Sequence, residues 1–419
     1  MDQGGRSLHY GRDDRFKMYY LLLLLLLLFP FGQLLRIPLG ISSVSLYGMD
    51  IMALACFLGV LFHARKYKDQ IVSSQLFWPL SLFVVFGVVG LLINPLHIPI
   101  DQLAISSLYL ARFIVYAGLY VCVRIIIKNN PEKQTTILYG LFGAGVLLAL
   151  FGILQYFLYP NLRNLYYLGW DPHQYRLFST LFDPNFTGIV LVLTVLLGGS
   201  LWGEKKKISG VGRLGYLSIL GMVVLALILT YSRSSYVAFI LGLVLLYRRS
   251  ISWKWVIFGI VGFGLVLYLL PRPFGEGVRL ERTSTIFSRL KSYESAISII
   301  KQHPLTGVGF NAYRYAQHQF GYLPNSDWED VHSGSGTDNS LLFVWATAGI
   351  GGIAAFLWLL YRLVNVTTKT IAQKDLLVAS TVAVLLHSFF VNSFFYTWVL
   401  VWIFILVGVV EVSRTILKR

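Results

Sequence analysis

A series of apolar runs, each long enough or nearly long enough to cross a lipid bilayer, constrains the fold of this chain most strongly. A helix needs about 20 residues to cross a hydrocarbon core of about 30 Å. Only 13% of the residues are charged, whereas soluble domains have about 25%. We therefore expect an all-α polytopic membrane protein, in contact with the lipid bilayer, with about twelve transmembrane helices. The predicted windows are 18–37, 43–62, 75–93, 102–123, 136–158, 185–202, 214–230, 234–247, 253–270, 338–361, 376–394 and 397–414.

The distribution of basic residues predicts how these helices are oriented. If the N-terminus is cytoplasmic, 23 of the 35 lysines and arginines fall in cytoplasmic loops and tails. Every predicted cytoplasmic segment then carries basic residues, as the positive-inside rule requires. We therefore expect both termini in the cytoplasm. The net charge of +16 has this topological explanation and does not indicate a nucleic-acid partner.

The windows divide the chain into four regions. These are a cytoplasmic tail (1–17), the first nine spans (18–270), a large outward loop between spans nine and ten (271–337), and the last three spans with a cytoplasmic tail (338–419). Within the outward loop, the segment SRLKSYESAISIIKQHP predicts an amphipathic helix that ends at Pro304. Its spacing places four residues on one face: Leu290, Tyr293, Ile297 and Ile300.

The basic residues that remain on the outward side or within spans are mostly arginines. They comprise ten arginines and two lysines, although outer loops normally avoid both residue types. Arginine presents a rigid, always-charged fork that matches the oxygens of a phosphate group. This bias indicates recognition of an anion.

Two of these arginines lie where a charge is costly. Arg233 sits in the tight outward turn TYSRSSY (230–236), where it could hold a phosphate, snorkel to lipid headgroups or cap the adjoining helix ends. Arg112 falls near the middle of the fourth window, where a charge costs about 2.5–3.5 kcal/mol. We expect Arg112 either to pair with Asp50 inside the membrane or to contact a ligand.

Four outward stretches resemble the O-antigen ligase and O-antigen polymerase superfamily of bacterial membrane glycosyltransferases. The resemblance covers about residues 100–410 and keeps the family's order: an arginine before a Pro-Asn turn, a Ser-Arg turn, a His-Pro-Leu-x-Gly-Val-Gly segment, and a His-Asn or Asp-Asn pair that opens a membrane helix. The stretches are YRLFSTLFDPNFTG (175–188), TYSRSSY (230–236), FSRLKSYESAISIIKQHPLTGVGF (287–310) and SGTDNSLLFVWATAGIGG (335–352).

This resemblance implies transfer of a glycan from an undecaprenyl-pyrophosphate donor to an acceptor sugar hydroxyl, in surface polysaccharide or lipopolysaccharide biosynthesis. The site would face the periplasm or cell exterior from the bacterial cytoplasmic membrane. The reaction would be inverting and would use no metal and no cofactor. Arg176, Arg233 and Arg289 match the family's arginines and would clamp the pyrophosphate, with Arg282 as a further candidate.

The attacking hydroxyl also needs a base within hydrogen-bond reach. Asp338 precedes Asn339 where ligases of the family have the His-Asn pair, so we expect both at the catalytic site. Asp338 could accept the proton or orient the hydroxyl, and it could also cap the tenth helix. His332 is the reserve candidate. The acceptor could be lipid A core, a protein or another growing glycan, so ligase and polymerase both stay open.

A transporter or flippase for lipid-linked glycans is the alternative function. Transport would place ionisable or helix-breaking residues at mid-depth in several spans, whereas here the arginines gather at one face. The sequence contains no Cys/His cluster with zinc spacing and no P-loop, so we expect neither a metal nor nucleotide hydrolysis. His387, in the eleventh window, is expected to pack or to form hydrogen bonds.

Overall fold

The computed structural model describes residues 17–39, 44–204, 211–273, 275–323, 328 and 336–411. The first helix is Lys17–Leu35, and its last part, Phe29–Leu35, is a 3-10 helix. The other long helices are α2 (Gly48–Phe62), α4 (Phe77–Ile93), α5 (Ile100–Asn129), α6 (Lys133–Leu158), α7 (Pro184–Glu204), α8 (Val211–Leu229), α9 (Arg233–Tyr247), α10 (Trp253–Leu269), α11 (Ser284–Gln302), α13 (Ser340–Val364), α14 (Ile371–His387) and α15 (Thr397–Val410). Shorter elements are α3 (Ala64–Val72), α12 (Tyr313–Gln319) and the 3-10 helices η2 (Arg163–Leu168), η3 (Ser179–Leu181), η4 (Glu276–Val278) and η6 (Ser393–Phe395).

Each of the twelve predicted windows coincides with a helix, but a count of membrane spans does not follow from this. Within the described residues, six helices are long and apolar enough to cross a bilayer, or seven if the bent pair α2–α3 is one span. Helices α4, α9, α10 and α15 are apolar but have only 10–17 residues. The chain is therefore a polytopic helical membrane protein, and the number twelve stays a prediction.

A small antiparallel sheet departs from the predicted all-α architecture. β1 (Arg36–Pro38) pairs with β2 (Ser45–Tyr47). These strands shorten the first two predicted windows, because the first helix stops at Leu35 and α2 starts only at Gly48. Pro38 cannot donate a backbone hydrogen bond, which suits the end of a short edge strand. The prediction was wrong for these strands, and the fold is nearly all-α.

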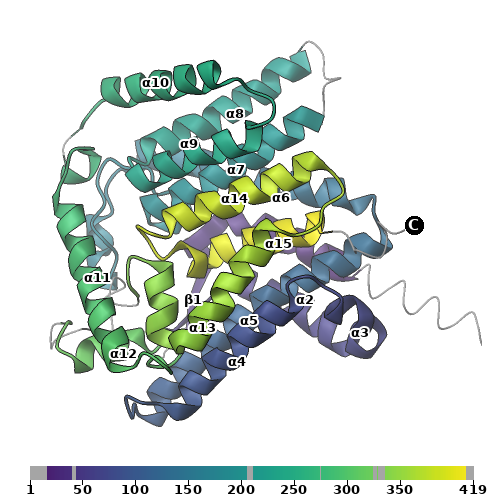
Figure 1. The fold of residues 1–419 in the computed structure, drawn as a ribbon. Helices are drawn as coiled ribbons and strands as arrows, with labels where there is room; N and C mark the ends of the chain where they lie inside the picture. The colour runs from purple at the N-terminus through teal and green to yellow at the C-terminus, as the bar shows by residue number, and fades with distance from the viewer. Residues whose placement is uncertain are drawn as a thin grey trace, which may run out of the picture.

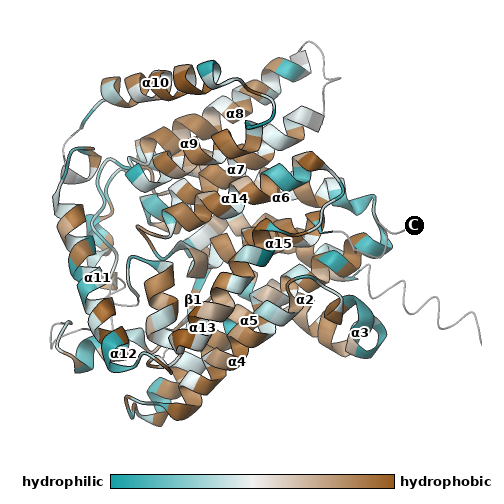
Figure 2. Cartoon of the chain, in the orientation of Figure 1, coloured by the Kyte–Doolittle hydropathy of each residue, from teal (hydrophilic) through white to brown (hydrophobic). Residues whose placement is uncertain are grey.

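The long helices form a bundle with hydrophilic elements on two opposite sides (Figures 1 and 2). Figure 1 shows α11 lying across the ends of the long helices, next to α12. In Figure 2, hydrophilic residues line α11 and α12 and, on the opposite side, α3, whereas α9 and α10 are mostly hydrophobic. We call the side formed by α11, α12 and the loops preceding α7, α9 and α13 the α11 end of the bundle. All predicted site arginines belong to this end.

The segment that follows α11 docks into a break in α13. Gly349 interrupts α13 with a φ of 65°, and the N–H of Ile350 donates to the carbonyl of Pro304 at 3.0 Å. A Cβ atom at Gly307 would lie 2.5 Å from the carbonyl carbon of Thr347, so only glycine allows this approach. The break in α13 thus anchors the α11 end to the membrane helices.

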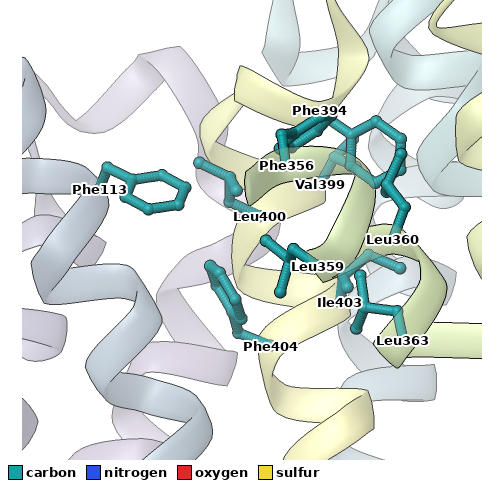
Figure 3. A pocket seen from close by; sticks show the side chains of 10 residues that line it. All are labelled: Phe113, Phe356, Leu359, Leu360, Leu363, Phe394, Val399, Leu400, Ile403 and Phe404. Atoms are coloured by element: carbon teal, nitrogen blue, oxygen red, sulfur yellow. The ribbon is translucent and has the colours of Figure 1, made fainter. Parts of the chain in front are cut away.

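Interhelical packing buries a continuous hydrophobic core. Helix α14 packs along α9 and α7, α13 packs along α4, and α15 packs along α5. A cavity of about 20 Å³ remains between α5, α13 and α15, and Figure 3 shows ten side chains around it, all of them apolar. A space this small and without polar partners is a packing defect and not a ligand site.

Helix α10 stands apart from this core. None of its residues is buried, and large side chains such as Trp255, Phe258 and Val261 are 60–70% exposed. Figures 1 and 2 show it as a hydrophobic helix at the margin of the bundle. An apolar helix with no buried face fits a lipid environment, since exposed apolar surface of this extent is unfavourable in water.

Arg112 and Asp50, the candidate intramembrane pair, lie together. Nη2 of Arg112 is 3.1 Å from Oδ2 of Asp50, and the guanidinium also donates to the carbonyl of Ser45. Asp50 accepts a further hydrogen bond from the N–H of Tyr47 at 2.7 Å and one from the hydroxyl of Tyr116. Arg112 therefore joins α5, α2 and β2, which favours its structural role over ligand contact.

Candidate active site

The turn between α8 and α9 presents main-chain carbonyls that bind arginine side chains of the α11 end. Tyr231 adopts a left-handed conformation with a φ of 51°. Arg233 follows as the first residue of α9. Three carbonyls of this region, those of Thr230, Tyr231 and Arg282, accept hydrogen bonds from arginine side chains. The turn thus brings the predicted arginines into one neighbourhood.

Arg176 is buried beneath this turn. Its Nε donates to the carbonyl of Thr230 at 2.9 Å and its Nη2 to that of Tyr231 at 3.4 Å. Burial, together with the positive charge of Arg282, lowers the pKa of Arg176 to about 9. The side chain is only 4% exposed, so it holds the turn in place and has little surface left for a ligand.

Arg233 points toward the loop that precedes α11. Its Nη1 donates to the carbonyl of Leu280 at 3.1 Å and to that of Arg282 at 3.0 Å. These hydrogen bonds tie the guanidinium to the loop before α11 and not to the ends of α8 and α9. Its Nη2 and Nε remain available to an anion, because these contacts use Nη1 alone.

Arg282 reinforces the same loop. Its Nη1 donates to the carbonyls of Gly277 at 2.7 Å and Arg279 at 2.8 Å, and its Nε to the hydroxyl of Thr285 at 3.1 Å. Its Nη2 reaches the carbonyl of Tyr231 at 3.5 Å. These contacts make Arg282 a residue that shapes the loop around Arg233.

Arg289, on α11, differs from the other three. Its guanidinium lies over the ring of Phe390 at 5.4 Å, and no described residue forms a hydrogen bond with it. Burial lowers the pKa of Arg289, and the charge of Arg233 lowers it further, while Asp338 opposes the shift. A half-buried guanidinium with open donors, in a positive field, is suited to receive an anion.

Arg176, Arg233 and Arg289 also lack carboxylate partners: no described carboxylate lies within salt-bridge distance of any of them. Partly desolvated cations without counter-ions are costly. A bound anion at the α11 end would relieve this cost.

The Asp338-Asn339 pair divides into a helix cap and a carboxylate without a capping role. Asn339 is the N-cap of α13, and its Oδ1 accepts from the N–H groups of Leu341 at 2.9 Å and Leu342 at 3.1 Å. The prediction that Asp338 could be this cap was therefore wrong. Its backbone N–H donates to Ser292 of α11 at 3.1 Å, which ties it to the helix that carries Arg289.

Burial and the negative charge of Asp183 raise the pKa of Asp338, and Arg289 partly offsets this shift. Asp183 itself is an N-cap of α7, because its Oδ1 accepts from the N–H groups of Asn185 and Phe186 at 2.6 and 3.0 Å. His332 lies outside the described residues. The half-buried carboxyl of Asp338 is thus the candidate base beside Arg289.

The loop before η3 contributes two residues that the sequence alone did not single out. One ligand atom each of Asp171, His173 and Asp183 lies within 4.8 Å of the others. Nε2 of His173 is buried and has no hydrogen-bond partner among the described residues. These three side chains are the group in the described structure that could hold a metal ion, although Arg176 and Arg282 place positive charge beside His173. The sequence did not indicate this group because Asp183 lies further along the chain than Asp171 and His173.

The electrostatics of this loop couple it to the candidate base. Asp171 is exposed at the surface, but partial desolvation, followed by the charges of Asp183 and Asp338, raises its pKa to about 6. Burial and the charges of Arg176 and Arg282 lower the pKa of His173 well below its usual value, so its ring is neutral. The α11 end therefore combines arginines with a group of mutually repelling carboxyls.

Comparison with known families gives a match over part of the chain. Residues 217–357 match the family described as O-Antigen ligase. The matched segment runs from α8 through much of α13 and contains Arg233, Arg282, Arg289, Asp338 and Asn339. The predicted resemblance to the O-antigen ligase and polymerase superfamily is confirmed. No curated protein matches the chain.

Arg176 lies before the matched segment and joins it through the carbonyls of Thr230 and Tyr231. The match and the apolar helices together support a multi-pass membrane protein with a ligase- or polymerase-like role in polysaccharide biosynthesis.

Proposed function

We propose that this chain transfers a glycan from an undecaprenyl-pyrophosphate donor to a sugar hydroxyl of an acceptor. The reaction takes place at the α11 end, which faces the periplasm or cell exterior while both termini lie in the cytoplasm. The acceptor is a growing glycan or a lipid A core. The gathering of Arg176, Arg233 and Arg289 without carboxylate partners carries this proposal.

The donor's leaving group explains the need for arginine. As the bond between the sugar's anomeric carbon and the phosphate oxygen breaks, negative charge grows on the pyrophosphate. Cations placed there beforehand stabilise this charge in a site of low dielectric. Arg289 and the open donors of Arg233 contact the pyrophosphate, while Arg176 and Arg282 hold the turn and the loop in position. The arginines supply this charge without a metal.

Asp338 provides the other half of the reaction. Its carboxylate accepts the proton of the acceptor hydroxyl as the oxygen attacks the anomeric carbon from the face opposite the leaving group. A single displacement of this kind inverts the configuration. The raised pKa of Asp338 favours this role, because a base is most effective when its pKa approaches the working pH.

Reconstitution tests the proposal directly. The purified protein is placed in vesicles with an undecaprenyl-pyrophosphate oligosaccharide and with either lipid A core or a second donor as acceptor, and products are separated on gels and weighed by mass spectrometry. A ladder indicates a polymerase and a single shift indicates a ligase. Absence of any product, with movement of labelled donor between leaflets, would replace this proposal with the transporter.

A further inference from the structure

A buried histidine connects two parts of the proposed site. His387 is the last residue of α14 and is 0% exposed. Its Nε2 lies 3.0 Å from the hydroxyl of Ser234 and 3.1 Å from that of Ser235, both in the first turn of α9. Its Nδ1 lies 2.6 Å from the hydroxyl of Ser393 in η6. Both ring nitrogens are therefore engaged, by different elements.

On the Nε2 side, hydrogen bonds lead to the start of α7. The hydroxyl of Ser235 donates to that of Ser232 at 2.9 Å, and Ser232 donates to Oδ1 of Asn185 at 2.9 Å. Arg233 lies between these serines. The imidazole thus fixes the turn from which Arg233 extends.

On the Nδ1 side, the contacts lead to the start of α13. The N–H of Ser340 donates to the carbonyl of Ser388 at 3.0 Å, and its hydroxyl donates to Oδ1 of Asn392 at 2.8 Å. Ser388 directly follows His387, and Ser340 comes two residues after Asp338. The imidazole is thus linked to the turn that carries the candidate base through Ser388 and through Asn392, the chain neighbours of His387 and Ser393.

The hydroxyls around His387 indicate which of its ring nitrogens carries the proton. Ser393 donates to the carbonyl of Val391 at 3.1 Å, so it accepts from an N–H at Nδ1. Nε2 then accepts from Ser234, since Ser235 donates to Ser232. This assignment rests on the hydrogen-bond network. A neutral imidazole protonated at Nδ1 bridges both sides.

We propose that His387 is a positioning residue that sets the separation between the Arg233 turn and the Asp338 turn. The inference rests on the proposed function, in which these turns carry the cation and the base of one reaction. An error of about 1 Å in such a separation can lower a rate by about 100-fold. The role differs from general stability, because it acts on the transfer step while donor binding is retained.

The test compares His387→Phe and Ser393→Ala with Ser380→Ala. Ser380 is a buried serine of α14 whose hydroxyl has no described hydrogen-bond partner, so it controls for the loss of a buried hydroxyl. We expect His387→Phe and Ser393→Ala to lower the single-turnover rate by about 10–100-fold, with donor Kd changed less than threefold. Their double variant should be little worse than His387→Phe alone, because both remove one bridge.

A second readout does not need activity. Spin labels at Val237 of α9 and Ile350 of α13, which are 50% and 49% exposed, report the separation of the two helices once Cys56 and Cys122 are alanine. His387→Phe should broaden or shift the distance distribution, and Ser380→Ala should not. An unchanged distribution, or an unchanged rate per folded molecule, overturns the positioning role. A wild-type protein that makes no product with any donor overturns the proposed function instead.

Discussion

The guanidinium of Arg233 donates a hydrogen bond to the main-chain carbonyl of Arg282, 49 residues further along the chain, at 3.0 Å. Arg282 in turn reaches the carbonyl of Tyr231, which also accepts from Arg176. The arginines are therefore of two kinds. Arg176 and Arg282 hold the backbone of the site, whereas Arg289 keeps its donors open to a ligand.

Replacing Arg289 by alanine should greatly slow transfer and leave the fold intact. The variant loses the cation that faces the leaving pyrophosphate but no hydrogen bond to a described residue. Loss of one such preplaced donor costs about 10²–10³ in rate. The measurement is the initial rate of product formation with purified protein of unchanged Tm. Lys291→Ala, an exposed cation on the same helix, serves as the control, and equal rates in the two variants would remove Arg289 from the site.

Replacing Arg176 by glutamine should instead destabilise the protein. The change leaves the carbonyl of Thr230 without its arginine donor, while the carbonyl of Tyr231 keeps the one from Arg282. A buried polar group left unpaired costs about 1–3 kcal/mol, so we expect a loss of about 1–3 kcal/mol. Thermal unfolding in detergent measures it. A variant with wild-type Tm and no activity would show that Arg176 acts on the ligand and not on the turn.

Substitutions of Asp338 and of Asn339 should have different effects on transfer and on stability in the same assays. Asp338→Asn removes the proposed base without touching the cap, so transfer should fall by about 10²–10⁴ at constant Tm. Asn339→Ala removes two capping hydrogen bonds and should cost about 1 kcal/mol of stability. Loss of stability in Asp338→Asn, with transfer retained, would show that Asp338 has a structural role and is not the base.

The sequence predicted the helices well because apolar length and charge alternation are local signals. It missed β1 and β2 because three-residue strands leave no periodic pattern within an apolar window. It also predicted Asp338 as a candidate cap, although the N-cap of α13 is the next residue, Asn339. Both residue types cap helices well, so composition alone could not decide between them.

The candidate site was predictable as a set of residues but not as an arrangement of roles. Arg176 and Arg289 look alike in the sequence, and only contacts 54 and 55 residues away show that Arg176 is committed to carbonyls. Asp171 and His173 were missed because their neighbour Asp183 follows only after η3. His387 could not be assigned from one window, because its partners come from α9 and η6.

Substitutions of Asp50 and Arg112 should have non-additive effects on stability. Asp50→Asn leaves the Arg112 guanidinium without its counter-charge inside the bundle, and breaking a buried pair in this way costs about 3–5 kcal/mol. The double variant Asp50→Asn with Arg112→Gln should recover part of that loss. Thermal unfolding of the purified variants measures both, with Asp101→Asn on the exposed start of α5 as control. Equal stability of Asp50→Asn and this control would show that the pair contributes nothing.

Asp171 should make the protein's stability depend on pH in a defined window. Although the residue is exposed, partial desolvation and the charges of Asp183 and Asp338 raise its pKa from 3.8 to about 6 in the folded protein. Between about pH 4 and pH 6 the folded state therefore holds more protons than the unfolded state, so the free energy of unfolding falls as pH rises through this window. Above about pH 6 the free energy of unfolding has fallen by its full amount, and below about pH 4 it has not fallen.

Asp171→Asn should remove this dependence. The variant should have a higher Tm than the wild type at pH 7.5 and the same Tm near pH 4, because an amide does not titrate in this range. Melting curves at intervals of half a pH unit test the difference, with Asp69→Asn on α3 as a control carboxyl far from the α11 end. If the wild type instead had the higher Tm at pH 7.5, the Asp171 carboxylate would have a favourable partner, such as a cation shared with His173 and Asp183. In that case added Mn²⁺ should raise the Tm of the wild type and leave that of Asp171→Asn unchanged.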